Sequence, residues 1–177
     1  MIKNICCFGD SNTYGYDPRS PLGDRYACNW CDLLTGCRVQ NLGMNGRTVP
    51  ADCRELMCRM KQDTQLLVIM LGTNDLLQGW SAGETAAKME QFLQTVRMQF
   101  PVLPVLLLTP PVIRIPAFEE ISRKLAEEYR VLAGKSGVYS ASTQDWNLSM
   151  ACDGVHLSEE GHRQTAERIL NFIKRLS

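Results

Sequence analysis

The chain has 177 residues, of which 45% are apolar and 21% charged, and its 19 lysines and arginines balance 19 aspartates and glutamates. This length predicts a single domain over residues 1–177, with enough chain to bury a substantial core. The even charge balance excludes the strongly basic surface typical of nucleic-acid-binding proteins, and it predicts neither a nucleic-acid partner nor an anionic membrane partner.

No apolar run reaches the roughly 18 residues of a membrane-spanning helix. The first apolar run is short and leads directly into Gly9-Asp10-Ser11, which does not fit a secretory signal peptide. We therefore expect a cytoplasmic protein that does not act at a membrane.

The chain has eight cysteines, and in the cytoplasm these are expected to be mostly small buried side chains, because disulfides are rare there. Cys28 and Cys31 have a C-x-x-C spacing, so a metal or redox site is the alternative interpretation. The sequence has no second pair of this kind. Its two histidines, His156 and His162, lie far away near the C-terminus, which argues against a zinc site.

Apolar runs and helical periodicity predict strands and helices that alternate along the chain. Short apolar runs mark the expected strands, at residues 2–8, 37–42, 65–71, 105–109 and 137–141. Apolar residues at helical spacing mark the expected helices, around residues 26–34, after Pro50, after Ser81, around residues 118–132 and beginning near Ser158.

This alternation predicts an α/β fold with right-handed crossovers, in which helices cover both faces of a parallel sheet. We therefore expect a three-layer, doubly wound α/β/α domain with a five-stranded parallel sheet. Ligands of such domains bind beyond the carboxyl ends of the strands. Polar residues that directly follow a strand are therefore candidates for the functional site.

A serine, an amide side chain and an aspartate–histidine pair follow different expected strands. Ser11 follows the first strand, Asn74 the third, and Asp153 and His156 the fifth. Serine needs an adjacent base to act as a nucleophile, and a histidine oriented by a carboxylate is suited to that role. The spacing lets Asp153 reach back to the ring of His156 in a tight turn, whereas His162 is expected to be a solvated helix residue.

Three donors are candidates for stabilising the oxyanion that forms during acyl transfer. They are the backbone N–H groups of Ser11 and Gly46 and the side-chain amide of Asn74. Gly46 lets the main chain approach a ligand closely because glycine has no Cβ. Asp10 and Asp75 are expected to brace their loops through hydrogen bonds rather than to take part in the chemistry.

Four short motifs in the sequence resemble those of a known enzyme family. The stretch Gly9-Asp10-Ser11, NLGMNGRT around Gly46, GTND around Asn74 and DGVH around His156 resemble the four sequence blocks of the SGNH hydrolases, also called GDSL-type esterases and lipases. They occur in the family's order and span nearly the whole chain. The longer stretch CFGDSNTYGYDP is similar to the arylesterase and acyltransferase branch of that family.

The resemblance implies a flavodoxin-like α/β/α fold with no metal and no cofactor. It also implies that Ser11 is the nucleophile, His156 the base and then the acid, and Asp153 the residue that orients His156. The backbone N–H groups of Ser11 and Gly46 and the side chain of Asn74 would form the oxyanion hole.

At two places this sequence differs from some other members of the family. Asn12 stands where the family's short name places leucine, which is a common variation. The segment between Asn74 and Ser81 is short, whereas some members carry longer loops there that build oligomers and narrow the site. An open cleft is therefore expected, and the sequence leaves a homo-oligomer open. Side chains that either line this cleft or pack in an ordinary way are Tyr14, Tyr16, Trp80 and Ile113–Ile115.

Together these residues predict a serine esterase that hydrolyses small acyl esters, of the acetyl or aryl type, through an acyl-enzyme intermediate. Its expected partner is a small-molecule ester, and attack by an alcohol in place of water would make it an acyltransferase. A carbohydrate O-deacetylase or a thioesterase on the same fold is the alternative, because the sequence does not place the side chains of the substrate pockets.

Two other classes of protein compete with an esterase. One is a flavin- or phosphate-binding module that uses the loop Ser11–Gly15, which leaves Asn74, Asp153 and His156 without a role. The other is a metal or redox protein that uses the cysteines.

Overall fold

The computed structural model describes residues 2–20 and 22–176, and these residues form a sheet of five parallel strands in the order β2-β1-β3-β4-β5. The strands are β1 (Asn4–Gly9), β2 (Arg38–Gly43), β3 (Leu66–Met70), β4 (Val105–Leu108) and β5 (Tyr139–Ala141). This order and direction confirm the predicted flavodoxin-like, doubly wound sheet. The strand order reverses beside β1, and ligands of such folds bind in the crevice at that point.

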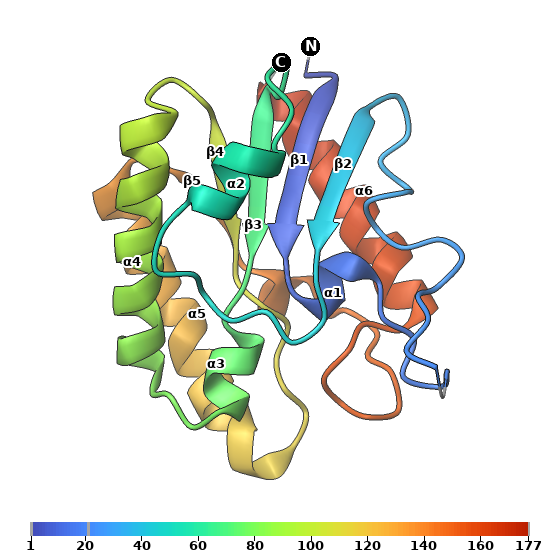
Figure 1. Ribbon diagram of the computed structural model, residues 1–177. Helices are drawn as coiled ribbons and strands as arrows, with labels where there is room; N and C mark the ends of the chain where they lie inside the picture. The colour runs from blue at the N-terminus through green and yellow to red at the C-terminus, as the bar shows by residue number, and fades with distance from the viewer. Residues whose placement is uncertain (1, 21, 177) are drawn as a thin grey trace.

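Helices connect the strands and cover the sheet (Figure 1). They are α1 (Ser11–Tyr14), α2 (Arg54–Arg59), α3 (Thr73–Leu77), α4 (Ala82–Gln99), α5 (Pro116–Ser136) and α6 (Glu159–Leu176), with a 3₁₀ helix η1 (Thr143–Trp146). Reciprocal hydrogen bonds between Ser81 and Glu84 form a capping box at the start of α4. Among the described residues, no helix combines the length and hydropathy needed to cross a membrane.

Successive residues of each strand send their side chains to opposite faces of the sheet and so build two cores. Cys6 and Phe8 pack with α2, α4 and α5, whereas Ile5 and Cys7 pack on the other face with α6. Figure 1 shows the same division, with α4 and α5 on one side of the sheet and α6 on the other. Because the central strands are buried on both faces, their sequences are continuous apolar runs.

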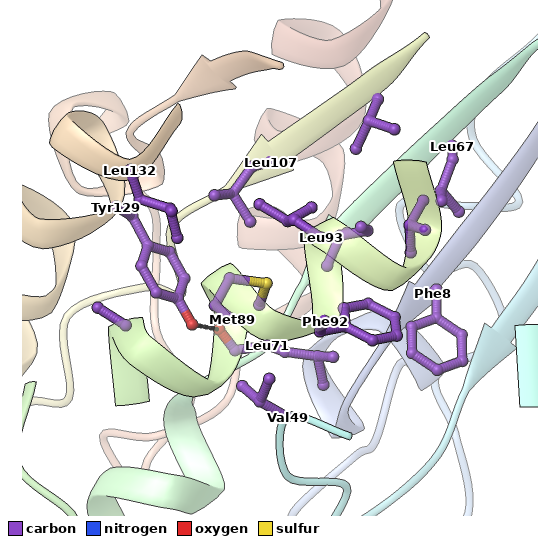
Figure 2. Packing of buried hydrophobic residues seen from close by; sticks show 14 of the residues in the cluster. Phe8, Val49, Leu67, Leu71, Met89, Phe92, Leu93, Leu107, Tyr129 and Leu132 are labelled. Carbon is purple, nitrogen blue, oxygen red and sulfur yellow. Dashed lines mark hydrogen bonds between the residues drawn. The ribbon is translucent and has the colours of Figure 1, made fainter. Parts of the chain in front are cut away.

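The core beneath α4 and α5 includes one polar group with a defined partner (Figure 2). Phe8 stacks on Phe92 of α4 with ring centroids 5.7 Å apart. The Tyr129 hydroxyl of α5 donates a hydrogen bond to the Leu71 carbonyl at 3.1 Å. Burial raises the pKa of Tyr129, so the phenol remains a neutral donor. This bond holds the chain directly after β3, just before the segment that carries Asn74.

The helix expected around residues 26–34 is wrong, because that segment forms only a turn at residues 30–33. The Leu33 N–H donates to the Asn29 carbonyl within this turn at 3.1 Å, but two donors before it have side-chain partners instead. The Trp30 N–H donates to Nδ1 of His162 at 3.4 Å, and the Asn29 side chain accepts the Cys31 N–H at 3.0 Å. The expected apolar face is nevertheless buried, since Trp30 lies in the core that faces α6.

The short helices α1, α2 and α3 also differ from expectation. α2 begins at Arg54 and not at Pro50, because the Asp52 carboxylate accepts the Arg54 N–H at 3.0 Å in a turn that precedes the helix. α1 and α3 have four and five residues, which is too short to show helical periodicity in the sequence. Both follow directly after central strands and carry polar residues of the sheet edge.

The cysteines are all free, and their burial agrees only in part with expectation. Those buried as expected are Cys6, Cys7, Cys31 and Cys53, with Cys37 half-buried. Those exposed, contrary to expectation, are Cys28, Cys58 and Cys152. Within residues 2–20 and 22–176, no three or more histidines, cysteines or carboxylates gather closely enough to hold a metal ion.

His162 is buried, which contradicts its expected position in solvent. It is 1% exposed, and its ring meets the ring of Tyr26 edge-on with centroids 5.3 Å apart. It shares the inner face of α6 with Ala166 and Ile169, so the helical spacing did contain the signal for burial. Burial lowers the pKa of His162 from 6.5 to about 4, so the ring is neutral at pH 7.

Replacing His162 with phenylalanine is expected to reduce the loss of stability in mild acid. The pKa of His162 is about 4 in the folded protein and 6.5 in the unfolded chain, so the protein loses stability as the pH falls through this window. At about pH 5 the titration of His162 lowers the free energy of unfolding by roughly 2 kcal/mol relative to neutral pH. The phenylalanine variant has no group there that titrates. Urea unfolding near pH 7.5 and pH 5 measures the effect, and an equal pH dependence in both proteins would contradict it.

Candidate active site

The candidate nucleophile Ser11 is the first residue of α1, at the carboxyl end of β1. Asp10 precedes it as the N-cap, and Asp10 Oδ1 accepts the Asn12 N–H at 2.9 Å, which confirms the bracing role expected for Asp10. α1 ends after one turn at Gly15, whose φ is +94°. The turn from strand to helix therefore fixes the backbone of Ser11, which is 6% exposed.

Two glycines let α1 pack directly against the ends of β1 and β2. A Cβ at Gly9 would lie 2.0 Å from Oγ1 of Thr13, and one at Gly43 would lie 2.2 Å from the backbone nitrogen of Tyr14. A larger residue at either position would push α1, and with it Ser11, away from the sheet. Close packing of backbone on backbone thus sets the position of the serine.

The structure brings Ser11, His156 and Asp153 together, although Ser11 and His156 are 145 residues apart. Ser11 Oγ lies 2.8 Å from His156 Nε2, and His156 Nδ1 lies 2.5 Å from Asp153 Oδ2. An ionised carboxylate only accepts hydrogen bonds, so Nδ1 carries the proton and the lone pair of Nε2 accepts the Ser11 hydroxyl. In this tautomer the imidazole can take a proton from Ser11.

Asp153 is held by the loop that it shares with His156. Its Oδ1 accepts the N–H groups of Val155 and His156 at 3.0 and 3.1 Å. Burial disfavours its charge, but the hydrogen bonds from the His156 ring and from these N–H groups outweigh burial and hold the pKa of Asp153 below its ordinary value. Asp153 is therefore ionised at neutral pH and can stabilise a protonated imidazole. Antiparallel pairing between Met150 and Leu157 closes the loop.

The candidate oxyanion donors lie at the same edge of the sheet as Ser11. Gly46 lies in the loop after β2 with a φ of +74°, and Asn74 is the second residue of α3. Among the described residues, the backbone N–H groups of Ser11 and Gly46 have no protein acceptor, so both are available to a ligand. Asn74 Nδ2 donates to the Arg47 carbonyl at 2.9 Å, which leaves its second hydrogen available.

A buried arginine, which the sequence pattern did not reveal as such, ties the loop after β2 to the strand that ends at the serine. Nη1 of Arg47 donates to the carbonyl of Gly9 at 2.9 Å and to that of Leu42, and Nη2 pairs with Glu55 at 2.5 Å. The guanidinium also lies 4.1 Å from the centroid of the Phe8 ring. An arginine in a glycine-rich loop is usually solvated, so its burial depends on partners that only the fold supplies.

Asn74 and its neighbour Asp75 both hold the loop that follows β2. Asn74 binds the Arg47 carbonyl, and Asp75 Oδ2 accepts the Val49 N–H at 3.0 Å. The other oxygen of Asp75 pairs with Lys88 of α4. These contacts confirm the bracing role expected for Asp75, and they tie the Asn74 segment to the loop that carries the second candidate donor.

Asp10 is fully buried beside the serine turn. Burial raises the pKa of Asp10 from 3.8 to about 6, against the opposing effect of the hydrogen bond from the Asn12 N–H. The stability that Asp10 contributes is therefore fully present in acid and is lost as the pH rises through 6. This sign is opposite to that of His162.

The ring of Tyr16 borders the site, with its centroid 4.7 Å from that of the His156 ring and a tilt of 54°. This contact places Tyr16 beside the candidate base. A separate groove of about 700 Å³ is lined by residues within 57–65 and 99–104, which precede β3 and β4. It therefore lies at the amino ends of the strands and is not part of the edge that carries Ser11.

Comparisons with known proteins agree with this fold and identify a family. The sequence matches the GDSL-like lipase/acylhydrolase family over residues 7–164. A sequence comparison with curated proteins finds no match. Among solved structures, the native aryl esterase of M. smegmatis is similar, with 25% identity over 99% of this chain and 100% of that chain and a TM-score of 0.83.

Two further solved structures share the fold at lower identity. A carbohydrate acetylesterase family member from Sinorhizobium meliloti is 24% identical over 99% of each chain, with a TM-score of 0.83. A member of the lipolytic protein G-D-S-L family from Veillonella parvula is 20% identical over 98% of this chain and 99% of that chain, with a TM-score of 0.79. The family match spans the chain from β1 into α6, so the chain belongs to the GDSL-like lipase/acylhydrolase family and is an ester-hydrolysing enzyme with the SGNH hydrolase fold.

Proposed function

We propose that this enzyme is a serine esterase that hydrolyses small acyl esters, of the acetyl or aryl type, through an acyl-enzyme intermediate on Ser11. The observation that carries the proposal is the hydrogen-bonded series from Ser11 Oγ through the His156 ring to Asp153 Oδ2. The 2.8 Å between Oγ and Nε2 lies within the reach of direct proton transfer. Similarity to an aryl esterase and to a carbohydrate acetylesterase supports a small acyl group.

In the acylation step, Ser11 Oγ attacks the carbonyl carbon of the ester while its proton moves to His156 Nε2. The carbonyl electron pair moves to oxygen, and the oxyanion accepts hydrogen bonds from the N–H groups of Ser11 and Gly46 and from the Asn74 amide. Asp153 stabilises the imidazolium. Collapse of the intermediate breaks the bond to the alcohol, which leaves with the proton from Nε2.

In the deacylation step, water attacks the acyl-enzyme and gives a proton to His156 Nε2. The second oxyanion uses the same donors, and its collapse returns the proton to Ser11 Oγ and releases the acid. Another alcohol in place of water would receive the acyl group, which is the acyltransferase reaction. Both outcomes share the acyl-enzyme, so both depend on Ser11.

A carbohydrate O-acetyl ester is the second candidate substrate, because a carbohydrate acetylesterase family member has a TM-score of 0.83 with this chain. Its hydrolysis would use the same steps, with a sugar hydroxyl as the leaving group. The family assignment argues against the competing interpretation of Ser11–Gly15 as a flavin- or phosphate-binding loop.

Replacing Ser11 with alanine is expected to abolish hydrolysis of p-nitrophenyl acetate while the protein stays folded, because the variant lacks the attacking oxygen. Release of p-nitrophenolate measures activity, and circular dichroism measures folding. Ser142→Ala is the control, since the buried Ser142 hydroxyl has no hydrogen-bond partner among the described residues. Undiminished activity in the Ser11 variant would remove the proposal.

Replacing Asn74 with alanine is expected to lower kcat by roughly 100-fold or more, because one oxyanion donor is lost. Asn74→Asp keeps the shape but replaces the donor with a carboxylate, so a similar loss is expected there. Steady-state kinetics with p-nitrophenyl acetate separates kcat from KM. An unchanged kcat in both variants would exclude Asn74 from the oxyanion hole.

A series of p-nitrophenyl esters with acetyl, butyryl and octanoyl groups is expected to show the highest kcat/KM for acetyl, by at least about tenfold over octanoyl. Acetylated xylo-oligosaccharides and an acetyl thioester, compared at matched concentrations, distinguish the deacetylase and thioesterase alternatives. The Ser11→Ala variant corrects for background hydrolysis. A preference for octanoyl would contradict the assignment to small acyl groups.

A further inference from the structure

Asn12, directly after the nucleophile candidate, is a buried amide with every polar group in use. It is 1% exposed. Its backbone N–H donates to Asp10 Oδ1 at 2.9 Å, and its backbone carbonyl accepts the indole N–H of Trp30 at 2.9 Å. These two bonds hold the main chain of Asn12 in place, so the position of its Cα and Cβ atoms relative to Ser11 is fixed.

The side chain of Asn12 crosses to the loop that carries His156 and binds on both sides of that residue. Nδ2 donates to the Val155 carbonyl at 3.2 Å, and Oδ1 accepts the Leu157 N–H at 2.8 Å. The carboxamide thus makes one donated and one accepted bond to backbone groups that bracket the histidine. Leu157 is itself fully buried, so water does not readily replace its partner.

Few other hydrogen bonds connect the two loops. The ring of Tyr16 also contacts that of His156, and the Arg114 N–H holds the histidine loop from another side by donating to the Gly154 carbonyl at 2.7 Å. Within the described residues, the hydrogen bonds between residues 9–15 and 150–157 are the Ser11–His156 bond and the two made by the Asn12 side chain. The bonds of Asp153 and the pairing of Met150 with Leu157 hold His156 only relative to its own loop. The position of the imidazole relative to Ser11 therefore depends strongly on Asn12.

We propose that Asn12 is a positioning residue that sets the distance and direction between Ser11 Oγ and His156 Nε2. The inference rests on the proposed serine chemistry, and it gives a role to a residue that stands where the family's short name places leucine. Leucine has the same branching as asparagine but neither a donor nor an acceptor, so it cannot make either bond to the histidine loop. A small displacement of a reacting group costs rate without abolishing substrate binding.

The test compares Asn12→Leu with Asn29→Ala in the full chain. Asn29 is a matched control because it is also buried, at 0% exposure, and also makes one donated and one accepted side-chain bond, to Asp32 and Cys31. Asn12→Leu is expected to lower kcat for p-nitrophenyl acetate by about 10- to 100-fold with KM within about twofold. Asn29→Ala is expected to keep kcat within about twofold when both variants are assayed well below their unfolding temperatures.

Asn12→Ser is the second variant, in case the leucine variant does not fold. Its hydroxyl is too short to reach the histidine loop, and the same loss of kcat is expected. The rate of inactivation by diethyl p-nitrophenyl phosphate should fall in parallel in either Asn12 variant, because that reaction needs the Ser11–His156 pair but no acyl pocket.

Nitrogen NMR of the two histidine rings gives a readout that general destabilisation would not produce. In Asn12→Leu or Asn12→Ser the His156 ring resonances are expected to move or broaden, whereas those of the buried His162 stay in place as an internal reference. A kcat within twofold of the native enzyme in a folded Asn12 variant would overturn the proposal, and so would an equal loss in Asn29→Ala. If Ser11→Ala stays active, the serine mechanism itself fails, whatever the Asn12 variants show.

Discussion

The hydrogen bond between Ser11 Oγ and His156 Nε2 is the contact on which the site depends, because it joins segments 145 residues apart. Neither partner alone has the required chemistry, since the serine hydroxyl is a weak nucleophile and the imidazole only moves protons. The sheet order alone does not make this contact, because β3 and β4 lie between β1 and β5, and the long segment after β5 brings His156 back to the serine. With β1 between β2 and β3, the serine turn lies beside both loops that carry the other two candidate oxyanion donors.

Paired polar groups, rather than apolar contacts alone, hold these loops at the sheet edge. Arg47, Asp75 and Asn12 are buried, and each binds backbone groups of a neighbouring loop. A buried polar group without a partner is costly, so each of these side chains favours the single loop arrangement that satisfies it. The geometry of the candidate site thus follows from hydrogen-bond satisfaction among buried side chains.

Two buried ionisable groups near the site give the fold opposing responses to pH. Burial raises the pKa of Asp10 to about 6 and lowers that of His162 to about 4. As the pH falls from 6 to 4, the protonation of Asp10 favours the folded state while the required protonation of His162 disfavours it. The two effects partly offset one another, so these two groups together change the stability with pH less than either group alone.

The sequence by itself determined the strands, the doubly wound order and the candidates Ser11, Gly46, Asn74, Asp153 and His156. Central strands buried on both faces are continuous apolar runs, and polar residues that follow them must gather at one edge. Only the tertiary structure decided the loop at residues 26–34 and the burial of Arg47, as well as the bonds from Asn12 to the histidine loop. In each case at least one hydrogen-bond partner lies far away in the chain, namely His162 for Trp30, Gly9 for Arg47 and Leu157 for Asn12. No local pattern of residues encodes a partner that folding alone brings near.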